Sequence, residues 1–142
     1  MVALTAERNT TRRTGETRVE PVAATVKIFA GSIVMRNAAG YLTKGATAAG
    51  AMGVGRADAT VNNTGAAGAL SLEYSMGIFR FANSAAGDLI TIADIGKPCF
   101  IVDDQTVAKT DGAATRSRAG IVDGIDGNSV WVRFDEALTR AA

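Results

Sequence analysis

The residues of this chain with the most reactive side chains lie within one short stretch, residues 96–112. This stretch holds the only cysteine, Cys99, and two adjacent carboxylates, Asp103 and Asp104. A cysteine thiolate can act as a nucleophile, and two carboxylates on either side of one bond can act as an acid and base pair. The stretch could therefore form an active site, or it could form two strands joined by a turn.

The surrounding sequence favours two strands and a turn. A nucleophilic cysteine needs a base or a cation that lowers its pKa, and the chain contains no histidine to supply the base. In a strand over residues 97–102, Cys99 and Ile101 share one face, which makes Cys99 a small core residue. Adjacent strand residues point to opposite faces, so Asp103 and Asp104 are poorly placed to act on one bond. We therefore expect no enzymatic activity and no cofactor.

Two other short motifs resemble binding sites without matching them. Residues 123–128 carry three oxygen donors, Asp123, Asp126 and Asn128, but they lack the alternate ligand spacing and the final glutamate of an EF-hand. Residues 50–55 contain glycines at a spacing that differs from the dinucleotide fingerprint, and no βαβ pattern surrounds them. We expect neither a metal site nor a nucleotide site at these motifs.

The first 22 residues differ in composition from the rest of the chain. Arginines alternate with glutamates among threonines, and almost no large apolar side chain is present to be buried. This composition predicts an extended N-terminal arm over residues 1–22. The arm could be a disordered terminus, or it could become ordered on a partner whose carboxylates bind guanidinium groups in pairs of hydrogen bonds. In the second case the contact residues are Arg8, Arg12, Arg13 and Arg18.

Two more arginines, Arg116 and Arg118, lie in an expected loop between apolar runs. They could contact acidic groups of a partner. A solvated loop is the simpler interpretation, because exposed ion pairs contribute little.

Most of the remaining chain consists of short apolar runs separated by glycine, asparagine and aspartate. Each run has the length of a strand and is rich in Val, Ile, Phe, Tyr or Trp. In one of them, Leu70, Leu72 and Tyr74 alternate with polar residues, as in a half-buried antiparallel strand. Turn residues that predict hairpins occupy residues 36–41, 62–69 and 123–129. The runs are residues 24–30, 32–36, 51–57, 69–75, 78–82, 97–103, 119–124 and 129–134.

These runs predict an all-β protein. About eight to ten short antiparallel strands without crossover helices are typical of a jelly-roll-like β-sandwich, which we rank first, or of a small barrel. Helix is expected only as one turn at residues 91–96 and at the C-terminal end. We divide the chain into an extended N-terminal arm over residues 1–22, a β-sandwich domain over residues 23–136 and a C-terminal tail over residues 137–142.

Composition also limits the partners of the protein. The net charge is +1, so the chain has no overall field that would attract nucleic acid or an anionic membrane surface. No apolar run is as long as a membrane span, and the first residues lack the apolar core of a signal peptide. We expect a protein made in the cytoplasm of its host, with no direct contact with nucleic acid or membrane.

The order of the sequence fragments resembles that of one protein family. Residues 79–134 are similar to the C-terminal half of the capsid cement proteins, also called decoration proteins, of tailed bacteriophages; the similarity lies in the order ADIGK, VDDQTVAKT, AGIV and VWV. Residues 30–45 and 53–69 resemble the opening hairpin of this family and the strand that follows it. The resemblance spans residues 23–134, and the arm before Pro21 departs from the plainer start expected of the family.

The resemblance implies a structural virion protein without enzymatic activity. A cement protein of this family sits on the outer surface of the capsid, bridges neighbouring major capsid subunits and stabilises the shell against packaged DNA. The expected partners are then the major capsid protein lattice and other copies of this chain, in a dimer or a trimer. The arm could contact either the capsid or a neighbouring cement subunit.

Two other classes of protein stay open. One is a phage head fibre or receptor-binding module, which would bind to host cells rather than to capsids. The other is a small ligand-binding or hydrolytic β-barrel, which would need a concave pocket with converging polar groups. The lack of histidine and the low aromatic content of 6% count against the second class.

Overall fold

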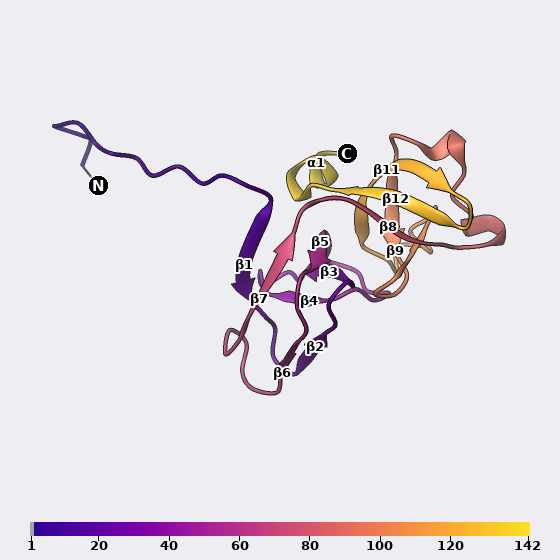
Figure 1. Cartoon of the computed structure of the whole chain (residues 1–142), viewed down its shortest axis with the longest axis horizontal. Helices are drawn as coiled ribbons and strands as arrows, with labels where there is room; N and C mark the ends of the chain where they lie inside the picture. Colours follow the sequence, from indigo (N-terminus) through magenta and orange to yellow (C-terminus); the bar gives the residue numbers. More distant parts are fainter. Residues whose placement is uncertain (1) are drawn as a thin grey trace.

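Twelve β-strands, two short 3₁₀ helices and one α-helix form the regular structure of the computed structural model, which describes residues 2–142 (Figure 1). The all-β class is confirmed, although the strands are more numerous than the sequence predicts. Every apolar run identified in the sequence contains a strand. The strands outside those runs are short and carry few apolar residues: β1 (Thr17–Pro21), β4 (Leu42–Lys44), β6 (Val61–Asn63) and β10 (Thr106–Ala108).

One half of the molecule is an open antiparallel sheet with the strand order β1-β7-β5-β3-β4. Its other three strands are β3 (Ile33–Arg36), β5 (Met52–Ala57) and β7 (Ser71–Ser75). A two-stranded antiparallel ribbon of β2 (Val26–Ile28) and β6 packs against it. The sheet and the ribbon enclose one core, which contains Val22, Ile28, Val34, Leu42, Val54, Leu72 and Tyr74.

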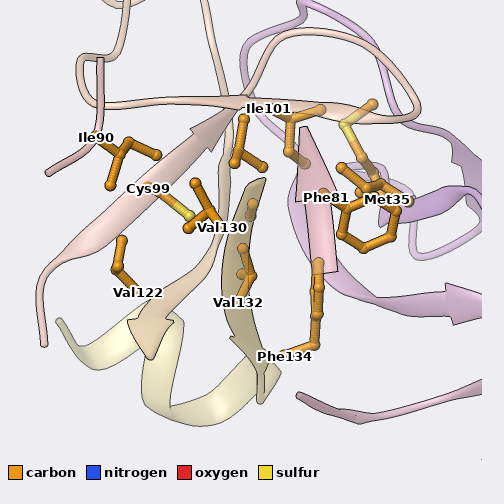
Figure 2. Packing of buried hydrophobic residues seen from close by; sticks show 12 residues of the cluster. Met35, Phe81, Ile90, Cys99, Ile101, Val122, Val130, Val132 and Phe134 are labelled. Atoms are coloured by element: carbon orange, nitrogen blue, oxygen red, sulfur yellow. The ribbon is translucent and has the colours of Figure 1, made fainter. Parts of the chain in front are cut away.

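The other half is a small closed barrel with the strand order β10-β8-β12-β11-β9, one of the two architectures predicted from the sequence. Neighbouring strands are antiparallel except β8 and β10, which are parallel. Figure 2 shows Cys99 inside the barrel core, near Ile90, Val122 and Val130. The longer strands of the barrel are β8 (Gly77–Asn83), β9 (Pro98–Ile101), β11 (Arg118–Asp126) and β12 (Ser129–Phe134).

Strand β3 joins the two halves, because both of its faces are buried. Ile33 and Met35 belong to the barrel core, whereas Val34 belongs to the core of the open sheet. A second close contact lies where β5 crosses β11: a Cβ atom at Gly53 would lie 2.2 Å from the carbonyl oxygen of Ala119. Only glycine allows the two backbones to approach this closely.

Two of the three predicted hairpins are present. Residues 36–41 connect β3 to β4, and residues 123–129 include the turn between β11 and β12, where Gly127 has a φ of 59°. The prediction for residues 62–69 is wrong, because β6 pairs with β2 whereas β7 pairs with β1 and β5. These residues therefore carry the chain from the ribbon to the sheet.

The two expected helical turns are confirmed. The 3₁₀ helix η2 (Ile92–Asp94) begins at Thr91, whose hydroxyl accepts a hydrogen bond from the N–H of Ala93, and a second 3₁₀ helix, η1 (Ala86–Asp88), precedes it. Helix α1 (Glu136–Ala141) begins at Asp135, whose carboxylate accepts a hydrogen bond from the N–H of Leu138. Thr139 of α1 is fully buried, so the segment assigned to a C-terminal tail is packed onto the body.

Candidate interaction surface

The N-terminal arm extends away from the body, on the side opposite the barrel (Figure 1). Residues 2–17 are all exposed, and residues 2–14 form no strand or helix. Arg8, Arg12 and Arg13 lie in this extended part, and none of them forms an ion pair with a carboxylate in residues 2–142. The guanidinium groups of the arm are therefore open to a partner.

The structure corrects the end of the arm. Residues 17–21, which the sequence analysis assigned to the arm, form β1 at the edge of the open sheet. Arg18 lies in this strand, and its guanidinium donates to the carbonyl oxygens of Gly15 and Thr17 at 2.8 and 3.0 Å. Arg18 thus binds backbone groups at the base of the arm, whereas Arg8, Arg12 and Arg13 lie in its extended part.

A cluster around Arg36 fixes the base of the arm to the body. The guanidinium of Arg36 lies 2.7 Å from the Glu20 carboxylate of β1 and 3.1 Å from the Glu136 carboxylate of α1. It also donates to the hydroxyl of Tyr74 at 3.3 Å, and that hydroxyl donates to Glu20. We call Glu20, Arg36, Tyr74 and Glu136 the Arg36 cluster; it joins β1, β3, β7 and α1.

The contacts in the Arg36 cluster shift the ionisation of its members. The hydrogen bond from Arg36 lowers the pKa of Glu20 despite partial burial, which acts in the opposite direction. The same hydrogen bond raises the pKa of Arg36. Burial, followed by the hydrogen bond to Glu20, raises the pKa of Tyr74 to about 12. At neutral pH Glu20 is therefore a carboxylate, Arg36 a guanidinium and Tyr74 a neutral phenol, and charge-assisted hydrogen bonds hold the three groups together.

The two arginines expected in a loop lie elsewhere and bind groups of their own chain, and the loop assignment is wrong for Arg118, which is the first residue of β11. Arg116 pairs with Asp88 at 3.1 Å, and only 17% of its side chain is exposed. Hydrogen bonds from Thr110 and then from Arg116 lower the pKa of Asp88. Arg118 donates to the backbone carbonyl of Thr139 in helix α1 at 3.2 Å. The structure thus separates these two arginines from those of the arm and gives them partners within the fold.

The stretch that raised the question of an active site forms two strands and a turn. Cys99 is completely buried in β9, and burial raises the pKa of its thiol to about 12. Asp103 accepts a hydrogen bond from the N–H of Gln105 at 2.9 Å, as in an Asx turn. The backbone carbonyl of Asp104 accepts from Ile33 at 2.8 Å. Cys99 is thus a core residue of β9, and Asp103 and Asp104 have structural roles in the connection between β9 and β10.

The structure also reveals an exposed face that the sequence analysis did not identify. On the outside of the barrel, Trp131 lies opposite Arg80, and Arg133 lies opposite Ile78. The guanidinium of Arg80 lies 5.9 Å from the Trp131 ring centroid and 3.1 Å from the Asp126 carboxylate. We call Ile78, Arg80, Trp131 and Arg133 the Trp131 face. Period-two alternation in residues 129–134 could have revealed that Trp131 points outward.

Comparisons of the chain with models of protein families, with curated proteins and with solved structures found no match. None of the helices in residues 2–142 has the length and apolar character needed to cross a membrane. Across the same residues, no three acidic, histidine or cysteine side chains are grouped so that they could hold a metal ion. The geometry therefore defines an all-β protein with an exposed basic arm, and its function has to be inferred from these features.

Proposed function

We propose that this chain is a structural protein of a tailed-phage head, which binds the outer surface of the capsid and bridges neighbouring major capsid subunits. The observation that carries the proposal is the arm: residues 2–16 are extended and exposed, and the Arg36 cluster fixes the strand from which they depart. The resemblance of residues 79–134 to cement proteins supports it independently. In this role the protein stabilises the shell by binding alone.

The composition of the arm suits binding along a surface. Its backbone groups could add a strand to an exposed sheet edge of a capsid subunit. Arg8, Arg12 and Arg13 could then form charge-assisted hydrogen bonds with acidic groups, which would set the register of the contact. Ordering the arm costs conformational entropy, so a single contact is modest. High retention would arise because many contacts are linked through the lattice.

The Trp131 face offers the body of the protein a second contact. Tryptophan and arginine are the residues most enriched among those that contribute strongly to protein interfaces. Trp131 is 37% exposed and Ile78 is 40% exposed, so both would lose apolar accessible area in such a contact. An arm and a body surface together would let one subunit span two capsid subunits.

The experiment that tests the proposed function measures retention on expanded shells that lack the protein, across a salt series. We would compare wild type with a variant lacking residues 2–14 and with the double variant Arg12→Ala and Arg13→Ala. Exposed charge-assisted contacts weaken with salt, so the double variant should dissociate faster, and its dissociation should depend less on salt. The matched control is the double variant Lys44→Ala and Lys97→Ala, which removes two cations outside the arm.

Three outcomes would count against the proposal. Failure of wild-type protein to bind the shells would reject a capsid function, and binding to host cells instead would favour a fibre or receptor-binding module. Equal binding to unassembled capsid protein would remove the requirement for a lattice. Equal retention of all variants at every salt concentration would show that the arm is passive.

A further inference from the structure

A hollow of about 310 Å³ lies at the root of the arm, where the arm meets the residues that lead into helix α1. Met76 and Ile78 give it an apolar lining, and the carboxylates of Glu16 and Asp135 also line it. A Cβ atom at Gly77 would lie 3.5 Å from the Glu16 carboxylate, so this carboxylate lies over the glycine. An apolar lining with acidic groups matches an arginine side chain, whose long stem is apolar and whose end is cationic. We call this feature the arm-root hollow.

The carboxylates of the arm-root hollow have no cationic partner in the part of the chain that the structure describes. Neither Glu16 nor Asp135 forms an ion pair there. Asp135 uses one carboxylate oxygen to accept a hydrogen bond from the N–H of Leu138 at 3.0 Å, which leaves its second oxygen for another donor. Arg133 also lines the hollow, but its guanidinium lies 3.9 Å from the Asp123 carboxylate on β11. The hollow therefore offers acidic groups that its own chain leaves unpaired.

The arm carries the complementary charges. Arg12 and Arg13 are the arm cations nearest to its root in the sequence, and neither forms an ion pair within residues 2–142. Arg8 lies four residues further out, about 13 Å along an extended chain. The arm extends away from the body (Figure 1), so it carries both guanidinium groups away from the hollow of their own chain. Two adjacent cations and two carboxylates thus lack partners within one copy.

We propose that two copies of this chain exchange arms, so that Arg12 and Arg13 of each copy bind in the arm-root hollow of the other. Because the hollow lies beside the root of the arm, a two-fold axis between two roots brings each arm to the partner's hollow. Such an interface is isologous, and exchange of an identical element is a low-cost route to a dimer. The guanidinium groups then meet the partner's Glu16 and the partner's Asp135. Their stems cover the partner's Ile78, whose side chain is 40% exposed in the single chain.

The dimer should be weak in dilute solution, because exposed ion pairs contribute little. Its two contacts form together, which favours the dimer as the protein concentration rises, and added salt should weaken it. On a shell, acidic capsid groups would compete with the hollow for the same arginines. The inference concerns protein that has not met a shell, so it goes beyond the proposed function and can fail or succeed independently of capsid binding.

Limited proteolysis of wild-type protein gives one readout of the exchange. In dilute protein, trypsin should cut after Arg8, Arg12 and Arg13 at similar rates. As the protein concentration rises, cleavage after Arg12 and Arg13 should slow relative to cleavage after Arg8, because only the first two sites lie in the partner's hollow. A ratio of rates that does not change with concentration would contradict the exchange.

Charge reversal tests the exchange by sedimentation over a concentration series. Wild type should shift from monomer to dimer. The double variant Arg12→Glu and Arg13→Glu has an acidic arm, and Glu16→Arg has a basic group in its hollow, so each variant alone should stay monomeric. An equimolar mixture of the two should form dimers again, because the acidic arm meets the altered hollow while the native arm meets the native hollow. Mixing would not restore a contact within one chain.

The matched control is the double variant Arg8→Glu and Lys97→Glu, which reverses two charges outside the proposed contact and should dimerise as wild type does. Unchanged thermal unfolding would show that the exposed substitutions leave the fold intact. The proposal is overturned if wild type stays monomeric throughout, or if the mixture of the two charge-reversed variants contains no more dimer than either variant alone.

Discussion

At the scale of single residues, the burial of Cys99 shows that this cysteine is a core residue rather than a reactive thiol. Its thiol is fully buried and donates a hydrogen bond to the carbonyl of Gly120 at 3.7 Å. Cys99→Ser should lower the free energy of unfolding by about 1–3 kcal/mol, because a hydroxyl that lacks a well-placed partner is costly to bury. Urea unfolding measures the loss. The native thiol should react slowly with a thiol reagent until the protein unfolds; rapid labelling of folded protein would contradict its core position.

The Arg36 cluster gives a second prediction at this scale, for stability in acid. The hydrogen bond from Arg36 holds the folded-state pKa of Glu20 below its usual value of 4.5. A lowered carboxyl pKa contributes stability above the unfolded-state value, and that contribution is lost as the pH falls through the folded-state pKa. Glu20→Gln should therefore unfold more easily at pH 7 and show a shallower loss of stability below about pH 4.5. Glu73→Gln, on the exposed face of β7, should keep the wild-type slope.

The sequence could predict some residue roles, because side chains along a strand point alternately to its two faces. Cys99 and Ile101 point inward as expected, since both belong to one short strand. The Arg36 cluster could not be predicted, because Arg36 and Glu136 lie 100 residues apart and no periodic pattern links them. The arm arginines were identified from composition, but the roles of Arg116 and Arg118 depend on partners that only the folded chain brings near.

At the scale of elements, the sequence predicts the strands whose own residues indicate burial. It misses the strands whose place depends on distant segments of the chain. Strands such as β5 and β12 lie in apolar runs of the sequence, and these runs alone predict a buried strand. Strand β10 has three residues, and its place in the barrel depends on pairing with β8 and β9 rather than on its own composition. Residues 62–69 contain good turn residues, yet they connect different sheets, because turn chemistry does not determine which strands pair.

The contact between β5 and β11 gives a prediction for the elements. Gly53→Ala would place a methyl group 2.2 Å from a backbone oxygen of Ala119, so one strand would have to move. Overpacking of this kind typically costs about 1–3 kcal/mol, and denaturant unfolding measures it. Gly87→Ala is the matched control, because a Cβ atom there meets nothing within 4 Å. Equal stability of the two variants would show that the two strands are not packed as closely as described.

At the scale of the whole molecule, a folded body carries an extended arm, and the Arg36 cluster holds the strand from which the arm departs. Residues 2–14 have little apolar surface to offset the entropy of ordering, so trypsin should cut free protein quickly after Arg8, Arg12 and Arg13. Cleavage after Arg18 requires β1 to leave the sheet. Its rate should follow the population of that local opening, and it should therefore be slower than cleavage at the arm sites.

Loss of the Arg36 cluster should change this order of cleavage. Arg36→Met removes the ion pairs that hold β1 to β3 and α1 but keeps much of the apolar stem, so cleavage after Arg18 should accelerate while the arm sites are cut as before. Arg80→Met, on the Trp131 face, removes an arginine far from β1 along the chain and should change neither rate. Mass spectrometry of the fragments over time separates the sites. If Arg18 is cut as fast as Arg12 in wild-type protein, β1 is not held by the cluster and the arm extends to Pro21.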